Sequence, residues 1–91
     1  PTIDVAPVRV ARARTLSWAG RLGDAATAYA EILAADPSDR DARYGLAQVR
    51  SWSGDLAGAT RAYQQLLADD PAEPRVLIGL AAIKLWQGRP G

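Results

Sequence analysis

Apolar residues along this chain recur at intervals of three and four positions, which places them on one face of an α-helix. Residues 22–35 give the clearest case, with the apolar positions Leu22, Ala25, Ala26, Tyr29, Ile32 and Leu33. Residues 56–70 repeat the pattern with Leu56, Ala59, Tyr63, Leu66 and Leu67. The pattern therefore predicts two amphipathic helices, each with an alanine and a tyrosine four residues apart near its centre.

Prolines and glycines mark where these helices end and divide the rest of the chain. Asp36-Pro37 and Asp70-Pro71 end the two amphipathic helices, because the residue before a proline is disfavoured in the α region. Gly20 and Gly54 mark the turns that precede them. Together these signals predict a non-helical lead at 1–7 and five helices, covering about 8–19, 22–35, 39–53, 56–70 and 74–87.

The chain contains an internal repeat. Residues 17–50 are followed directly by a second copy, residues 51–84, and 14 of the 34 aligned pairs are identical. Trp18, Trp52 and Trp86 keep the same 34-residue step. This period is typical of stacked helical hairpins. We call the helices at 8–19, 39–53 and 74–87 the A helices, and those at 22–35 and 56–70 the B helices.

The residues shared by the two copies resemble the tetratricopeptide repeat, whose motif includes a small residue, an aromatic residue four positions further and a later proline. The B helices match it as Ala25-x3-Tyr29 with Pro37, and Ala59-x3-Tyr63 with Pro71. The A helices match at their central small residue and, in two copies, at the preceding leucine: Ala13, Ala47, Ala81, Leu46 and Leu80.

The A helices also depart from the family motif. Its early tryptophan and its later tyrosine are replaced in all three copies, by Arg9, Arg43 and Leu77 and by Leu16, Arg50 and Lys84 respectively. In the first copy Arg12 replaces the leucine. A chaperone-tail carboxylate clamp, known in some relatives, needs asparagines in the groove. This chain has no Asn, so that function is not implied.

The resemblance implies an all-α, right-handed solenoid of helical hairpins in the order A-B-A-B-A. A single domain at 8–91 would hold one repeat at about 6–39, a second at about 40–73, and the A helix of a truncated third at about 74–87. The last residues, GRPG, stand where a third B helix would begin. Because the sequence contains no Met, we interpret the chain as a fragment of a longer protein.

The chain offers few groups for catalysis or metal binding. It has no His and no Cys, which removes the usual general bases, thiol nucleophiles and most zinc sites. We predict no enzyme and no cofactor. The net charge of +1 is far from the basic balance of a nucleic-acid-binding domain, so no nucleic acid is expected. The longest apolar run, residues 76–83, is too short to span a bilayer.

Acidic residues gather in the two inter-repeat turns: Asp36, Asp39, Asp41, Asp69, Asp70 and Glu73. Carboxylates can hold a hard cation, but aspartates beside helix starts are more often caps. We interpret these residues as caps and solvated helix ends and predict no metal site. Ser38 or Asp39 is expected to cap the second A helix, and Asp55 the second B helix.

The tryptophans of the A helices indicate a candidate binding surface. At 100° per residue, each Trp lies in line with residues four, seven and eleven positions before it, and in the family this line borders the concave side. A glycine stands seven residues before Trp52 and Trp86. It leaves a gap beside the indole for a ligand, or it makes room for an indole wedged between A helices. The predicted surface comprises Arg14, Trp18, Asp41, Tyr44, Gly45, Gln48, Trp52, Arg75, Ile78, Gly79, Ala82 and Trp86.

The leading functional hypothesis is a non-catalytic scaffold that binds a protein or peptide segment along the A helices. These helices carry eight basic residues against Asp41 alone, which favours an anionic partner unless the charges are solvated helix flanks. The alternative is direct binding of an anionic or sugar polymer, such as a polysaccharide, on a ladder of tryptophans. A third reading is a spacer array without a ligand.

A narrower resemblance rests on the turns WAGRL and WSGDL. They are similar to repeat arrays of bacterial envelope proteins that precede outer-membrane export barrels. This implies a periplasmic location and a role in polysaccharide export.

The third A helix is expected to mediate self-association. Its apolar stripe would be left uncovered by the absent third B helix, and it consists of Val76, Leu77, Leu80, Ala81 and Ile83. Uncovered apolar stripes of this kind mark interfaces, so we expect two copies to pair through it.

Overall fold

The computed structural model describes residues 6–87 and contains five α-helices and no strand within that range. They are α1 (Ala6–Trp18), α2 (Leu22–Ala35), α3 (Arg40–Trp52), α4 (Leu56–Asp69) and α5 (Pro74–Gln87). The first helix begins two residues earlier than predicted, with Pro7 in its first turn, where proline is tolerated. The remainder of the predicted lead and the GRPG segment lie outside the described residues.

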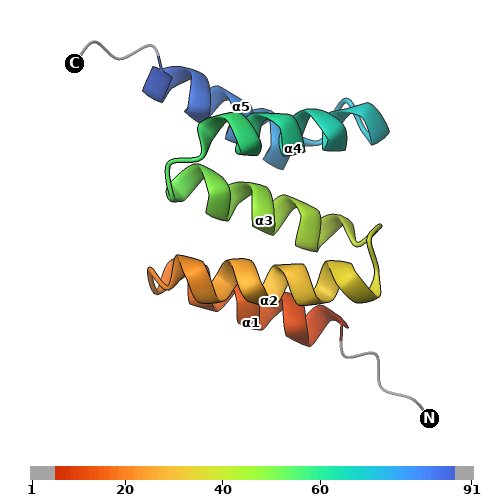
Figure 1. The fold of residues 1–91 in the computed structure, drawn as a ribbon. Coiled ribbons are helices and arrows are strands. Elements are labelled where there is room, and N and C mark those ends of the chain that lie inside the picture. Colours follow the sequence, from red (N-terminus) through yellow and green to blue (C-terminus); the bar gives the residue numbers. More distant parts are fainter. Residues whose placement is uncertain (1–5, 88–91) are drawn as a thin grey trace.

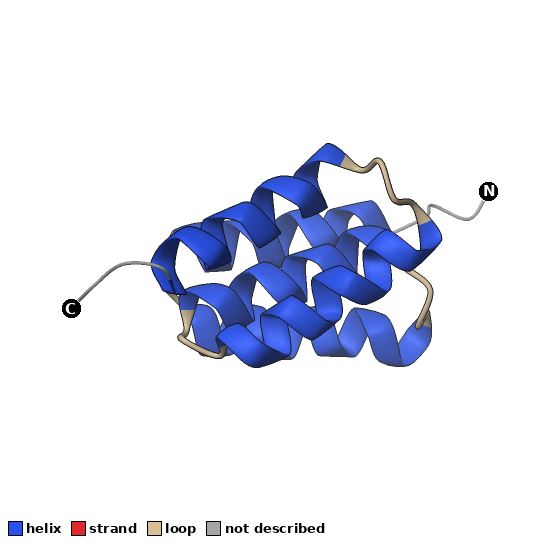
Figure 2. Cartoon of the chain, turned by 90° about the horizontal axis from the view of Figure 1, so that it is seen from above, coloured by secondary structure: helices blue, strands red, loops and turns tan. Residues whose placement is uncertain are grey.

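The helices stack in chain order, with α1 and α2 at one end and α4 and α5 at the other (Figure 1). Helix α3 packs on α2 on one side and on α4 on the other, and it also contacts α1 and α5. The turns lie at the two ends of the helices (Figure 2). The fold is therefore a solenoid of two hairpins followed by a single helix, as the repeat predicts.

Local signals in the sequence explain where the helices begin and end. The Asp39 carboxylate accepts a hydrogen bond from the Ala42 amide at 3.1 Å, and the Asp55 carboxylate accepts one from Gly58 at 2.9 Å. Both are the predicted N-caps. Gly20 and Gly54 have φ angles of 82° and 96°, a conformation that glycine adopts without steric cost.

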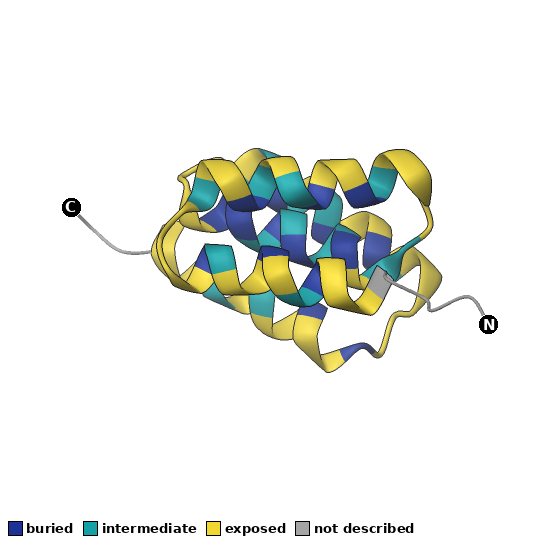
Figure 3. Ribbon diagram, turned by 90° about the horizontal axis from the view of Figure 1, so that it is seen from below, coloured by how far each residue is buried: buried dark blue, intermediate teal, exposed yellow. Residues whose placement is uncertain are grey.

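The core consists of two clusters, each centred on the tyrosine of a B helix. Tyr29 and Tyr63 are each 2% exposed, which confirms the repeat alignment that predicted equivalent buried sites for them. Burial of each ring stabilises the fold by roughly 1.5–3 kcal/mol. Small residues line the helix contacts and permit close packing: Ala13, Ala25, Ala42, Ala47 and Ala59 are fully buried. Figure 3 shows buried positions on the inward sides of the ribbons.

The structure corrects the predicted apolar stripe of α5. Val76 and Ile83 are buried in the second core cluster, which also contains residues of α4. The equivalent residues one repeat earlier are Ala42 and Val49 of α3, which belong to the cluster around Tyr29 of α2. The exposed apolar side of α5, which we call its outer face, consists of Leu77, Ile78, Ala81 and Leu85.

Candidate functional site

The two glycines of the predicted surface lie beneath tyrosine rings. A Cβ on Gly79 would lie 2.6 Å from Cζ of Tyr63, and a Cβ on Gly45 would overlap the Tyr29 ring more closely still. The space above each glycine is thus filled by the tyrosine of the preceding B helix. The two sequence interpretations, a gap beside an indole and room for an indole, did not include this ring, which comes from a different helix.

A hollow of about 210 Å³ lies over α1 and α3, and we call it the A-helix hollow. It gathers seven of the twelve predicted surface residues, namely Arg14, Trp18, Asp41, Tyr44, Gly45, Gln48 and Arg75. Val10 and Tyr29 also line it. Sequence reasoning assigned Tyr29 to the core alone. Its 34-residue equivalence with Tyr63 gives no sign that Tyr29 also lines a hollow beside Gly45.

Five predicted surface residues do not line this hollow. Ile78 belongs to the outer face of α5, and Gly79 lies beneath Tyr63. The other three are Trp52, Ala82 and Trp86, of which the two tryptophans are 41% and 46% exposed. Trp18 is 68% exposed. All three indoles are exposed, so none is wholly buried between A helices. Whether Trp52 and Trp86 bind a ligand stays a prediction.

The charges around the A-helix hollow are only partly paired. The Arg75 guanidinium lies 4.6 Å from the centre of the Tyr44 ring, 3.1 Å from the Asp41 carboxylate and 2.6 Å from that of Glu73. The Asp41 charge is therefore compensated. Arg14 lies 5.7 Å from the Trp18 ring centre, and within residues 6–87 its guanidinium forms no ion pair.

Two tyrosines, Tyr29 and Tyr44, form part of the lining of the hollow. Burial raises the pKa of Tyr29 above its ordinary value, although the nearby Arg14 charge opposes this shift. Burial likewise raises the pKa of Tyr44, again against the opposing charge of Arg75. Both hydroxyls therefore remain protonated at neutral pH and can donate a hydrogen bond to a ligand.

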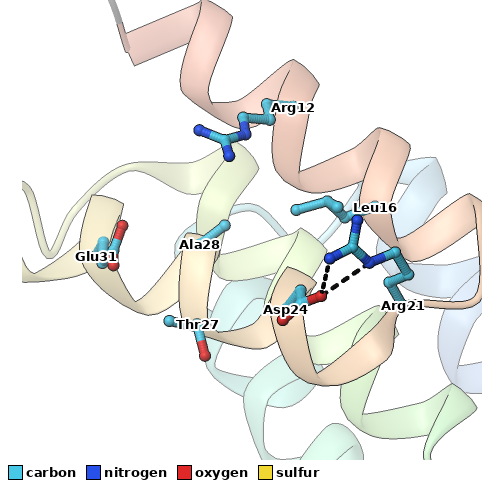
Figure 4. A pocket seen from close by; sticks show the side chains of 7 residues that line it. All are labelled: Arg12, Leu16, Arg21, Asp24, Thr27, Ala28 and Glu31. Atoms are coloured by element: carbon cyan, nitrogen blue, oxygen red, sulfur yellow. Dashed lines mark hydrogen bonds and ion pairs between the residues drawn. The ribbon is translucent and has the colours of Figure 1, made fainter.

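A second hollow, of about 270 Å³, lies between α1 and α2 (Figure 4). Its most prominent contact is the ion pair of Arg21 with Asp24 at 2.6 Å, between two exposed side chains. Arg12 and Glu31 also line it. One repeat later the positions of Arg12 and Glu31 are Leu46 and Gln65, so this polar site is not repeated. We regard the A-helix hollow as the stronger candidate.

Nothing in the described part of the chain indicates a metal centre, since no group of three potential ligands gathers there. None of the helices in residues 6–87 has the length and apolar character needed to cross a membrane. The side chains that gather around the A-helix hollow are hydrogen-bond donors, aromatic faces and one compensated carboxylate. Such an arrangement can bind a ligand.

Residues 18–60 match the family model of the tetratricopeptide repeat. The matched segment runs from the last residue of α1 through α2 and α3 into α4, and it covers less than half of the chain. A search of curated proteins and a search of solved structures gave no significant match. The family match, together with the five stacked helices, supports a tetratricopeptide-repeat family for this chain.

Proposed function

We propose that this chain is a non-catalytic protein-binding module and that it holds an acidic segment of a partner protein in the A-helix hollow. The family match supports protein binding in general terms. The proposed place of binding rests on the hollow itself, which is lined by residues from four helices. Examples are Trp18 of α1, Tyr29 of α2, Tyr44 of α3 and Arg75 of α5.

The charge balance of the hollow favours an acidic ligand group. Arg75 already neutralises Asp41, whereas Arg14 carries a charge that no carboxylate within the described range compensates. Tyr29 and Gln48 also line the hollow, and their side chains carry a hydroxyl and an amide, which are neutral donors. A carboxylate that accepts from these groups would gain charge-assisted hydrogen bonds. An apolar neighbour in the ligand could pack on the exposed Trp18 ring.

The test compares two fluorescently labelled peptide pools, with a central Leu-Glu or Leu-Gln and randomised flanks. We expect the Glu pool to bind more tightly in fluorescence polarisation. Arg14→Gln should weaken its binding about tenfold, because a hydrogen bond to a charged group contributes about 1.5–3 kcal/mol. The matched control is Arg9→Gln, which removes an exposed arginine of the same helix that does not line the hollow. Equal losses in the two variants, or no preference for Glu, would contradict the proposal.

A second candidate function is binding of an anionic or sugar polymer along the three tryptophans. The observation in its favour is that all three indoles are exposed at the 34-residue step. Titration of tryptophan fluorescence with uronic-acid and neutral-glucan oligomers tests it. A ladder requires Trp52, so Trp52→Ala should reduce oligomer binding. Peptide binding in the A-helix hollow should be unaffected, because Trp52 does not line it.

A periplasmic location and a part in bacterial polysaccharide export are also proposals, and they rest on the turns WAGRL and WSGDL alone. Cell fractionation with an antibody against this chain would test the location. Recovery with the cytoplasmic fraction would contradict it.

A further inference from the structure

The outer face of α5 occupies positions that the other A helices use for packing. Ala81 corresponds to Ala13 of α1 and Ala47 of α3, which are fully buried. Leu85 of α5 corresponds to Ser17 of α1 and Ser51 of α3, which are also buried. In α1 and α3 a B helix follows and packs on the A helix. The outer face of α5 thus continues an established type of interface.

This face is more apolar than its counterparts in α1 and α3. Leu77 stands where the other copies have Arg9 and Arg43, and Leu85 stands where they have buried serines. Leu85 is 72% exposed and Ile78 is 69% exposed. The opposite side of α5 is buried through Val76 and Ile83. A helix that is apolar all round is typical of one that is covered on both sides.

We propose that the outer face of α5 binds the same face of a second copy of this chain, with the two helices antiparallel about a two-fold axis at Ala81. The stripe Leu77-x3-Ala81-x3-Leu85 reads the same in both directions. An antiparallel pair therefore places Ala81 against its own copy and Leu77 of each copy against Leu85 of the other. A closed two-fold contact of this kind uses one surface twice.

Side-chain size and charge favour this occupant over a helix packed like α2 or α4. Helices α2 and α4 pack on A helices that have a small buried serine at the position of Leu85. If a helix packed on α5 in the same way, the larger leucine would overpack that contact. In the two-fold pair, the small Ala81 at the centre lets the helix axes approach to about 8 Å. The face itself carries no charge. Lys84 lies at its margin, where its aliphatic stem can cover Ile78 of the other copy.

The absence of cysteine from the chain permits a test of both the pairing and its register. Ala81→Cys should form a disulfide-linked dimer rapidly in a glutathione redox buffer, because the axis brings two equivalent Cα atoms within the roughly 4–7 Å that a disulfide spans. A mixture of the Leu77→Cys and Leu85→Cys chains should cross-link much faster than either chain alone. Thr27→Cys, an exposed site on α2, gives the rate of random collision.

Sedimentation equilibrium of the unmodified chain provides an independent readout. Few side chains contribute, and small interfaces are weak, so we expect a dimer that dissociates on dilution. Leu85→Asp should remain monomeric at all concentrations while keeping its helical circular dichroism. A monomeric unmodified chain would overturn the proposal, as would cross-linking of Ala81→Cys at the Thr27→Cys rate. Self-cross-linking of Leu77→Cys faster than the mixture would indicate a parallel pair and would overturn it as well.

Discussion

The two junctions between successive hairpins, α2 to α3 and α4 to α5, have the same packing but different polar contacts. In both, the tyrosine of the B helix covers the glycine of the next A helix. At the first junction Asp39 caps α3. Its equivalent at the second junction is Glu73, whose carboxylate forms ion pairs with Arg40 of α3 and Arg75 of α5.

Within residues 6–87, further polar side-chain contacts between helices are found around the second junction and not around the first. Arg40 also donates to the Leu66 carbonyl at 3.1 Å, and Arg43 lies 3.0 Å from the Asp69 carboxylate. One repeat earlier, Arg40 and Asp69 correspond to Ala6 and Ala35, which cannot form ion pairs. The comparison indicates that the tyrosine and glycine define the stack, because they are kept in both junctions. The ion pairs hold Arg75 over Tyr44, at the wall of the A-helix hollow.

The largest expected effect comes from disturbing the shared packing. Gly45→Ala should lower the free energy of unfolding by about 1–3 kcal/mol, since its Cβ would overlap the Tyr29 ring and overpack the core. The matched control is Gly23→Ala in α2, where nothing lies within 4 Å. There, alanine should stabilise the helix by up to about 1 kcal/mol. Urea titration of both variants measures the difference, and equal stabilities would contradict the Tyr29–Gly45 contact.

A smaller effect is expected from amide substitutions at the two equivalent acidic positions. Asp39→Asn should change stability by only a few tenths of a kcal/mol, because asparagine caps a helix as well as aspartate does. Glu73→Gln removes the charge that both arginines contact and should cost about 1–2 kcal/mol. Thermal unfolding of the two variants under the same conditions checks this order. A larger loss for Asp39→Asn would reverse our assignment of their roles.

The smallest effect is a pH dependence specific to the second junction. Burial alone would raise the pKa of Glu73, but hydrogen bonds from Arg75 and Arg40 outweigh it and lower that pKa below its ordinary value of 4.5. A carboxyl with a lowered folded-state pKa stabilises the fold fully above its unfolded-state pKa. That stabilisation is lost as pH falls through the folded-state value.

The stability difference between the unmodified chain and Glu73→Gln should therefore be constant above about pH 4.5 and shrink below it. Urea titrations at a series of pH values measure it. The same series on Asp39→Asn is the control for acid effects elsewhere in the chain. A difference that grows as the pH falls would contradict the lowered pKa.

The sequence by itself determined the helices, the repeat and most of the core. Caps such as Asp39 and Asp55, breakers such as Asp36-Pro37 and the three-and-four spacing of apolar residues act within a few positions along the chain. The helix boundaries could therefore be predicted to within one or two residues. Seven of the twelve predicted surface residues do line one hollow, because a helical line along α1 or α3 can be read from its sequence.

Only the tertiary structure decided what each helix face contacts. Helix α5 is apolar on all sides, so its pattern did not indicate that Val76 and Ile83 face the core and Leu85 the solvent. The position of Gly45 seven residues before Trp52 did not reveal that Tyr29 fills the space above this glycine, since the tyrosine ring belongs to another helix. The A-helix hollow joins residues far apart in sequence, such as Arg14 and Arg75. Such contacts depend on how helices stack, and stacking is set by long-range packing that no local spacing encodes.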